Sequence, residues 1–252
     1  FTSAQIHELD KYTIEHEPIS SLNLMERAAK ALTRAIEEEW LNHTPVVIFA
    51  GPGNNGGDAL AVGRMLAEDG YQVSVYLFNV HNKLSADCAA NKKRIIEGKK
   101  VKKFVEITLN FDPPQLTAET LVIDGLFGSG LNKPLAGGFA AMVKYINQSA
   151  AKVVSIDIPS GLMTEDNSNN IHANIIHADL TLTLQQKKLS MLMADNQQYL
   201  GRLRVLDIRL SQEYIQNAKC RCSILEEQDV RQLLRPRSDF AHKGSMGNAL
   251  LI

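Results

Sequence analysis

The sequence predicts an α/β fold built around a mostly parallel sheet, and three observations support this. Short apolar runs rich in β-branched residues recur along the chain, with helical periodicity between many of them. The run at residues 120–124 holds continuous apolar residues, as expected for a strand that is covered on both faces. The run at residues 46–50 leads directly into a glycine-rich loop and then into a helical pattern.

Two helices are expected before the first strand. Pro18 ends the first of them, and Ser20 or Ser21 caps the second. We expect both to pack on the sheet, and a subunit contact is the alternative. Helical patterns cover residues 3–17, 20–39, 59–66, 85–97 and 141–146. The expected strands are residues 46–50, 72–78, 103–107, 120–124, 152–157, 178–184 and 203–208.

Composition bounds the classes of protein to consider. The 252 residues suffice for one α/β domain, or for a domain plus a fragment. A formal net charge of -1 favours neither nucleic acid nor an anionic membrane as a partner. No apolar run approaches the roughly 20 residues that span a bilayer, and the first residues do not resemble a signal peptide. The three cysteines, Cys88, Cys220 and Cys222, are expected to be reduced thiols in a cytoplasmic protein.

The glycine-rich loop at residues 51–58 is the first candidate for ligand binding. It contains four glycines, two asparagines and Asp58 between a strand and a helix, an arrangement that places an anion at a helix N-terminus. Its spacing is neither the GxGxxG of dinucleotide folds nor that of a P-loop. Its amide and carboxylate oxygens also suit a hard cation or a ribose hydroxyl. A surface turn rich in glycine and asparagine is the alternative.

Two further polar loops follow strand ends, at residues 124–134 and 157–161. In a parallel sheet the carboxyl ends of all strands lie at one edge, where ligands bind. We therefore expect three loops that are far apart in the sequence to converge on one pocket.

Asp124 and Asp157, each closing a strand, are the candidate carboxylates of this pocket. One can bind a cation while the other transfers a proton. Capping of a helix or bracing of a loop is the alternative for each. Asn55, Asp124 and Ser160 together offer oxygen ligands, which favour potassium or magnesium over zinc.

Backbone N–H groups at Gly128, Ser129 and Gly130 offer donors for a phosphate, and Lys133 either adds a positive charge or is simply exposed. No Ser/His/Asp or Cys/His arrangement stands out. Each of the seven histidines is expected at the surface rather than in a catalytic role.

The three loops together resemble the NAD(P)H-hydrate epimerase family, the YjeF N-terminal domain. Residues 50–58, 124–130 and 157–161 are similar to its hallmark segments in order and spacing, and the leader at residues 10–28 resembles its N-terminal helices. The resemblance covers residues 3–225. Three positions depart from the family pattern, and they concern the rim of the pocket: Ala59, Leu184 and Ser190.

The resemblance implies a three-layer αβα Rossmann-like sandwich with extra N-terminal helices, usually a homodimer. It implies epimerisation of the R and S forms of hydrated NADH or NADPH. Asn55, Asp124 and Ser160 would hold potassium. Asp157 is the first choice for the catalytic acid or base, and Asp58 is the second. The expected contacts to the hydrate are Asn54, Asn55, Gly56, Gly57, Asp58, Gly128, Ser129, Gly130, Leu131, Asn132, Lys133, Pro134 and Asp157.

The chain is expected to divide into an epimerase domain at residues 1–225 and a second segment at residues 226–252. The tail resembles a linker and the first strand of a ribokinase-like ADP-dependent hydrate dehydratase, often fused behind this epimerase. A short C-terminal extension is the alternative. Two other functions compete with catalysis of epimerisation. One is a non-catalytic scaffold of the same fold, and the other is a nicotinamide oxidoreductase, which the first loop does not fit.

Overall fold

A parallel sheet organises the chain, as predicted. The computed structural model describes residues 1–220, 223–234, 238–242, 244 and 245. Within these residues the sheet has the order β3-β2-β1-β4-β5-β6-β7, and every neighbouring pair is parallel. The strands are β1 (Val46–Ala50), β2 (Val73–Phe78), β3 (Lys103–Ile107), β4 (Leu121–Gly125), β5 (Lys152–Ile156), β6 (Leu180–Leu184) and β7 (Arg202–Leu206). Each lies within two residues of its expected position.

Helices connect and cover these strands, again close to the expected positions. The α-helices are α1 (Ser3–His16), α2 (Ser21–Glu37), α3 (Asn54–Glu68), α4 (Ala86–Gly98), α5 (Gly137–Gln148), α6 (Gln197–Leu200), α7 (Gln212–Asn217) and α8 (Glu227–Leu233). Three short 3₁₀ helices are η1 (His172–Asn174), η2 (Leu189–Leu192) and η3 (Ala194–Asn196). The side chain of Ser20 accepts a hydrogen bond from the backbone N–H of Asn23, and it therefore caps α2 as predicted.

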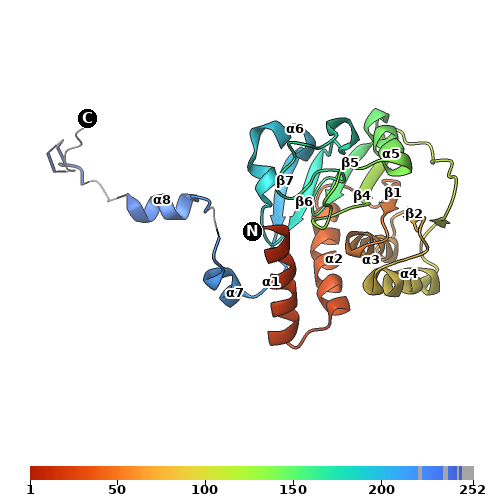
Figure 1. Ribbon diagram of the computed structural model, residues 1–252, viewed down its shortest axis with the longest axis horizontal. Helices are drawn as coiled ribbons and strands as arrows, with labels where there is room; N and C mark the ends of the chain where they lie inside the picture. Colours follow the sequence, from red (N-terminus) through yellow and green to blue (C-terminus); the bar gives the residue numbers. More distant parts are fainter. Residues whose placement is uncertain (221–222, 235–237, 243, 246–252) are drawn as a thin grey trace. The chain divides into compact units, whose positions relative to one another are not determined.

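Two apolar clusters lie on the two faces of the sheet and make a three-layer sandwich. On one face, α2, α3 and α4 pack on the sheet through residues such as Leu32, Leu66 and Ile95. Ile48 of β1 belongs to the same apolar cluster. Figure 1 shows these three helices side by side. On the other face, α5 packs on the sheet through Val143, next to Phe49 of β1. Because successive side chains of a strand point to opposite faces, Ile48 and Phe49 serve different layers.

The order in which the chain adds strands reverses between β1 and β4, which are neighbours in the middle of the sheet. From β1 the chain proceeds to β2 and β3 on one side, and from β4 it proceeds to β5, β6 and β7 on the other. Ala50 pairs with Gly125, so both strands end level with each other. In sheets of this type the crevice beyond such a reversal is where ligands bind.

The first two helices pack on the main body of the chain. Leu9 of α1 and Leu24 of α2 are buried in one apolar cluster with Ile208 and Leu210, which follow β7. This agrees with the expected packing role, whereas a contact between subunits stays a prediction.

The described residues divide into two compact units, residues 1–217 and the described part of the chain from residue 218 onward. The second unit contains α8. The expected strand at the end of the chain falls largely on residues 246–252, outside the described residues. The expected division at residue 225 therefore stays a prediction. Within the described part of the chain, every helix is too short or too polar to cross a bilayer.

Candidate active site

The first loop is shorter than expected, because α3 begins at Asn54 and already includes Asp58. The expected start at Ala59 is therefore wrong. The preceding Gly53 caps the helix without a side-chain hydrogen bond. Backbone N–H groups in the first turn of a helix have no partner within the helix, and they attract anions. The start of α3 thus directs donors to the carboxyl edge of the sheet.

Glycines allow three backbone segments to touch beside β1 and β4. A Cβ on Gly51 would lie 1.8 Å from the carbonyl oxygen of Leu126. A Cβ on Gly56 would lie 1.8 Å from the carbonyl oxygen of Gly51. Both positions accept only glycine unless the backbone moves. The first two loops are therefore held together by direct contact of main chains.

Gly56→Ala is expected to lower the free energy of unfolding by about 1–3 kcal/mol, because the clash is with backbone and cannot be relieved by a side-chain rotation. Alanine favours a helix, but by only about 1 kcal/mol. Denaturant titration measures the difference. Gly53→Ala is the matched control, since a Cβ there meets nothing within 4 Å. Equal stability of the two variants would contradict this view of the loop.

Asp124 lies at the centre of a buried hydrogen-bond network. Ser155 donates its hydroxyl to Oδ2 at 2.8 Å, and the backbone N–H of Ser160 donates to the same oxygen at 2.9 Å. The Ser160 hydroxyl donates to Oδ1 at 2.5 Å. Burial raises the pKa of the fully buried Asp124, and these hydrogen bonds act in the opposite direction. The network joins the ends of β4 and β5.

The three predicted potassium ligands surround one short segment, residues 125–128. The Ser160 hydroxyl accepts a hydrogen bond from the backbone N–H of Phe127 at 2.9 Å. The Asn55 side chain lies so close to Gly128 that a Cβ there would be 3.0 Å from its amide carbon. The Asn55 amide nitrogen is buried and has no hydrogen-bond partner. An amide oriented the other way would place an oxygen at this position. A carboxylate, a hydroxyl and an unsatisfied amide are the kind of oxygen-bearing groups that bind hard cations.

Asp157 is held in an uncommon backbone conformation and in a buried ion pair. Its φ is 67°, in the left-handed region that residues other than glycine rarely adopt. The Lys188 ammonium contacts Asp157 Oδ1, and the Lys188 side chain is only 1% exposed. The backbone N–H of Ser129 donates to Asp157 Oδ2 at 3.3 Å. Such strain persists only where the surrounding contacts fix it, and it is typical of functional sites.

Lys188 has three partners in the interior. Besides Asp157, its ammonium donates to the hydroxyl of Thr183 at 2.8 Å and to the carbonyl oxygen of Leu184 at 3.2 Å. Each donor of this buried ammonium is thus directed to an oxygen atom, as burial of a polar group requires. It thereby offsets the negative charge of Asp157 inside the protein.

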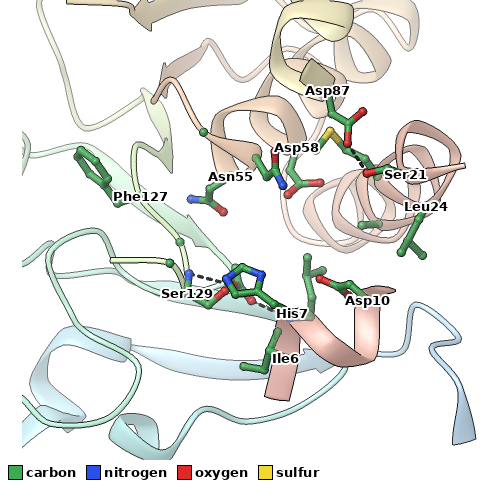
Figure 2. A pocket seen from close by; sticks show the side chains of 18 of the residues that line it. Ile6, His7, Asp10, Ser21, Leu24, Asn55, Asp58, Asp87, Phe127 and Ser129 are labelled. Atoms are coloured by element: carbon green, nitrogen blue, oxygen red, sulfur yellow. Dashed lines mark hydrogen bonds between the residues drawn. The ribbon is translucent and has the colours of Figure 1, made fainter. Parts of the chain in front are cut away.

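A cavity of about 740 Å³ lies where these loops meet. Figure 2 shows Asn55, Asp58 and Ser129 around it. Asp124 and Ser160 are fully buried and do not belong to its wall. Ten of the predicted contact residues line it: Asn54, Asn55, Asp58, Gly128, Ser129, Gly130, Leu131, Asn132, Lys133 and Asp157.

Three predicted contact residues lie outside this wall: Gly56, Gly57 and Pro134. Gly56 and Gly57 are buried in α3. Gly56 packs on the backbone of Gly51, and Gly57 faces the side chain of Met25. In the structure both glycines serve close packing, and their contact with the hydrate stays a prediction.

Sequence reasoning assigned no site role to the wall that α1 supplies. Ile6, His7 and Asp10 line the cavity, and His7 is exposed, as expected for the histidines. His7 and Asp10 are three positions apart and therefore share one face of the helix, a spacing that was readable in the sequence. No pattern in the sequence indicates that this face turns toward the loops.

Two carboxyl groups of the cavity, Asp10 and Asp58, have raised pKa values. Burial raises the pKa of Asp10 from 3.8 to about 6, and the neighbouring Asp157 adds to this. Burial also raises the pKa of Asp58 well above its ordinary value, with further increases from Asp157 and Asp10. Perturbed carboxyl groups gathered in one cleft are typical of catalytic sites.

The comparisons with known proteins identify the family of this chain. The family described as "YjeF-related protein N-terminus" matches residues 21–190. The chain belongs to this family. All three polar loops fall within the matched residues, which confirms the resemblance seen in the sequence.

Curated relatives of this YjeF-family chain fall into two groups. It is 34% identical to the NAD(P)H-hydrate epimerase of Limosilactobacillus fermentum over 206 residues, which cover 82% of this chain and 95% of that protein. It is 36% identical to the NAD(P)H-hydrate epimerase of Oenococcus oeni over 208 residues, with coverage of 82% and 95%. It is 31% identical to the bifunctional NAD(P)H-hydrate repair enzyme Nnr of Coxiella burnetii over 252 residues, which are 100% of this chain but 50% of that protein.

A solved structure supports the fold. The crystal structure of yeast ynu0, YNL200c, superposes with a TM-score of 0.62, covering 78% of this chain and 84% of that one. Sequence identity is 23%, so this likeness concerns the fold alone.

Proposed function

We propose that this YjeF-family protein epimerises the R and S forms of hydrated NADH and NADPH. The observation that carries the proposal is the meeting of three separate loops around one cavity that holds the ion-paired Asp157. Relatives that this chain matches over most of their length are named NAD(P)H-hydrate epimerases. The enzyme is therefore an isomerase that repairs a damaged nicotinamide cofactor.

The chemistry requires a positioned acid or base. The hydrate carries a hydroxyl on the ring carbon next to the ring nitrogen. Inverting this centre requires loss of the hydroxyl and return of water on the opposite face, or opening of the ring. Asp157 lines the cavity at the carboxyl end of β5 and is our choice for the proton-transfer group. Lys188 and the Ser129 backbone hold its carboxylate in a fixed orientation.

The remaining wall suits a dinucleotide. The start of α3 and the backbone N–H groups of Gly128 and Gly130 offer donors for phosphate oxygens. Lys133, also on the wall, adds a positive charge. Apolar side chains such as Leu24, Met25 and Leu131 line other parts of the cavity, where flat rings can pack.

Potassium is the metal that we propose for this site, held by Asn55, Asp124 and Ser160. The support is the unsatisfied amide of Asn55 beside a carboxylate and a hydroxyl that converge on residues 125–128. Among the described residues no three His, Cys, Asp or Glu side chains form a metal site. The proposed set has a single carboxylate, so it is not of that kind. When bound, the ion would organise the loops and the substrate phosphate.

Potassium chloride at ten times its dissociation constant is expected to stabilise the protein by about 1.4 kcal/mol more than lithium chloride, because a bound ligand shifts unfolding by mass action. Thermal unfolding at constant ionic strength measures this. Asn55→Ala should remove the difference between the two salts. Asn54→Ala, an exposed neighbour, is the control and should keep it. No difference between the salts in the unchanged protein would exclude a potassium-selective site.

Assembly and location are also proposals. We propose a homodimer, which is usual in the family that the sequence resembles, and a fused ADP-dependent dehydratase domain in a longer product. The match to bifunctional relatives supports the latter. A cytoplasmic location agrees with the unbonded thiols of Cys88 and Cys220.

A coupled assay tests the proposed function. The purified protein is mixed with both epimers of hydrated NADH and an excess of an S-specific dehydratase. Consumption of the R epimer should become faster in proportion to the amount of protein added. Consumption at the rate of the protein-free reaction would instead favour the non-catalytic scaffold.

A further inference from the structure

Helix α1 forms one wall of the cavity and is firmly anchored there. Its N-terminus has a capping box between Thr2 and Gln5. The hydroxyl of Ser3 donates to the carbonyl oxygen of Ser129 at 2.7 Å, which ties the helix to the second glycine-rich loop. Leu9, next to Asp10 in the chain, is 1% exposed. Asp10 is therefore held at a fixed place in the wall.

The Asp10 carboxyl differs from Asp157 in its partners. Asp157 receives the Lys188 ammonium and a backbone N–H. Among the described residues, no hydrogen-bond donor reaches the side chain of Asp10. Figure 2 shows Asp10 on α1 and Asp58 on α3 reaching into the same space. A half-buried carboxyl group that accepts no hydrogen bond favours its neutral, protonated form.

A second observation in the same cavity points to a ligand. The amide nitrogen of Asn55 is buried and unpartnered, and its side chain lines this cavity. Asp10 on α1 and Asp157 after β5 line this same cavity from different elements, so a ring bound in it can meet both carboxyl groups.

We propose that Asp10 is a second catalytic residue, the acid that faces the base Asp157 across the ring. This rests on the proposed epimerase function. Asp10 gives its proton to the hydroxyl oxygen as the carbon–oxygen bond breaks, and water leaves with the electron pair of that bond. The lone pair of the ring nitrogen forms a carbon–nitrogen double bond in its place. Water then adds to the other face, the ring nitrogen regains its electron pair, and Asp157 takes the proton that this water loses. One proton has moved from Asp10 to Asp157, so either exchange with solvent or the reverse reaction restores the enzyme.

The electrostatics of the cavity support this division of roles. Burial, with the charge of Asp157, raises the pKa of Asp10 to about 6, whereas His7 and Lys188 act to lower it. Two carboxyl groups in unlike surroundings can serve as acid and base at the same pH. The other carboxylates of the wall are Glu15, Asp58 and Asp87. Its basic groups are His7, Lys11, Lys133 and Lys188. Any of these can add to a pH profile, so the assignment needs a variant at Asp10 itself.

Asp10→Asn keeps the shape of the side chain but removes the acidic proton of the carboxyl group. We expect kcat to fall by about 10²–10⁴-fold while KM changes little. In the unchanged enzyme kcat should fall as the pH rises past about 6, because Asp10 loses its proton. This alkaline limb should be absent from the variant. The measurement starts from one purified epimer and follows the other by chromatography, with a protein-free blank. Glu8→Gln is the control, since Glu8 is exposed on the same helix and outside the cavity wall.

Thermal unfolding provides a second readout. The pKa of Asp10 is higher in the folded protein than in the unfolded chain. The folded protein therefore loses stability as the pH rises from about 4 to about 6, because the unfolded chain gives up this proton first. Asp10→Asn should therefore raise the unfolding midpoint by several degrees at pH 8 and leave it nearly unchanged at pH 4. A residue with a purely structural role would show a lower midpoint instead.

The outcomes separate the two claims. If the unchanged protein does not exceed the blank, the proposed epimerase function fails, and the role of Asp10 fails with it. If the unchanged protein is active and Asp10→Asn keeps its kcat and its alkaline limb, only the role of Asp10 is overturned. Lost activity together with a higher unfolding midpoint at pH 8 would support the proposal.

Discussion

Asp157→Asn is expected to reduce kcat for epimerisation by about 10²–10⁴-fold. The amide keeps the size of the side chain but cannot take the proton of the returning water. Asparagine tolerates the left-handed backbone conformation better than most residues, so the φ of 67° can be retained. The interconversion of purified epimers measures the effect.

A matched control separates this loss from a general effect of removing a carboxylate. Asp112→Asn makes the same change at an exposed residue outside the cavity wall, and it should keep full activity. Unchanged turnover in Asp157→Asn would remove Asp157 from the proton-transfer role.

Lys188→Met is expected to lower the free energy of unfolding by about 3–5 kcal/mol, since it leaves the carboxylate of Asp157 without its buried partner. Asp157→Asn alone has the opposite defect, an unpaired ammonium at a side chain that is 1% exposed. We therefore expect the asparagine variant to fold but to lose stability. Denaturant unfolding of both single variants measures these costs.

The double variant Asp157→Asn/Lys188→Met tests whether the two residues act as a pair. With both charges removed, no buried charge is left unpaired, and the double variant should be more stable than Lys188→Met alone. Its activity should stay as low as that of Asp157→Asn, because the proton-transfer group is missing. Additive losses of stability would show that the ion pair is not coupled in the folded protein.

The sheet and its polar loops were predictable because local pattern determines them. Strands at residues 46–50 and 121–125 are buried on both faces. Such strands show a continuous apolar run, which can be recognised without knowing the rest of the fold. Asp124 and Asp157 lie at strand ends, and the carboxyl ends of parallel strands share an edge. The convergence of the three loops therefore followed from sequence order alone.

Other features depend on tertiary contacts that no local pattern contains. The start of α3 was misplaced because Asn54, Asn55, Gly56 and Gly57 are poor helix formers, and packing against Gly51 overrides their preference. The burial of Lys188 could not be predicted from the sequence. Its partners Thr183 and Asp157 become neighbours only because β5 and β6 lie side by side in the sheet. The wall formed by α1 depends on its packing against residues after β7, nearly two hundred positions away.

A crystal structure of the protein with hydrated NADPH tests the central claim most directly, that the three loops and α1 enclose the damaged nicotinamide. We predict that the hydrated ring lies in the cavity within hydrogen-bond reach of Asp157 and that the phosphates contact the backbone at residues 128–130. A nucleotide bound on another surface, or one whose hydrated ring lies beyond the reach of Asp157, would contradict the account.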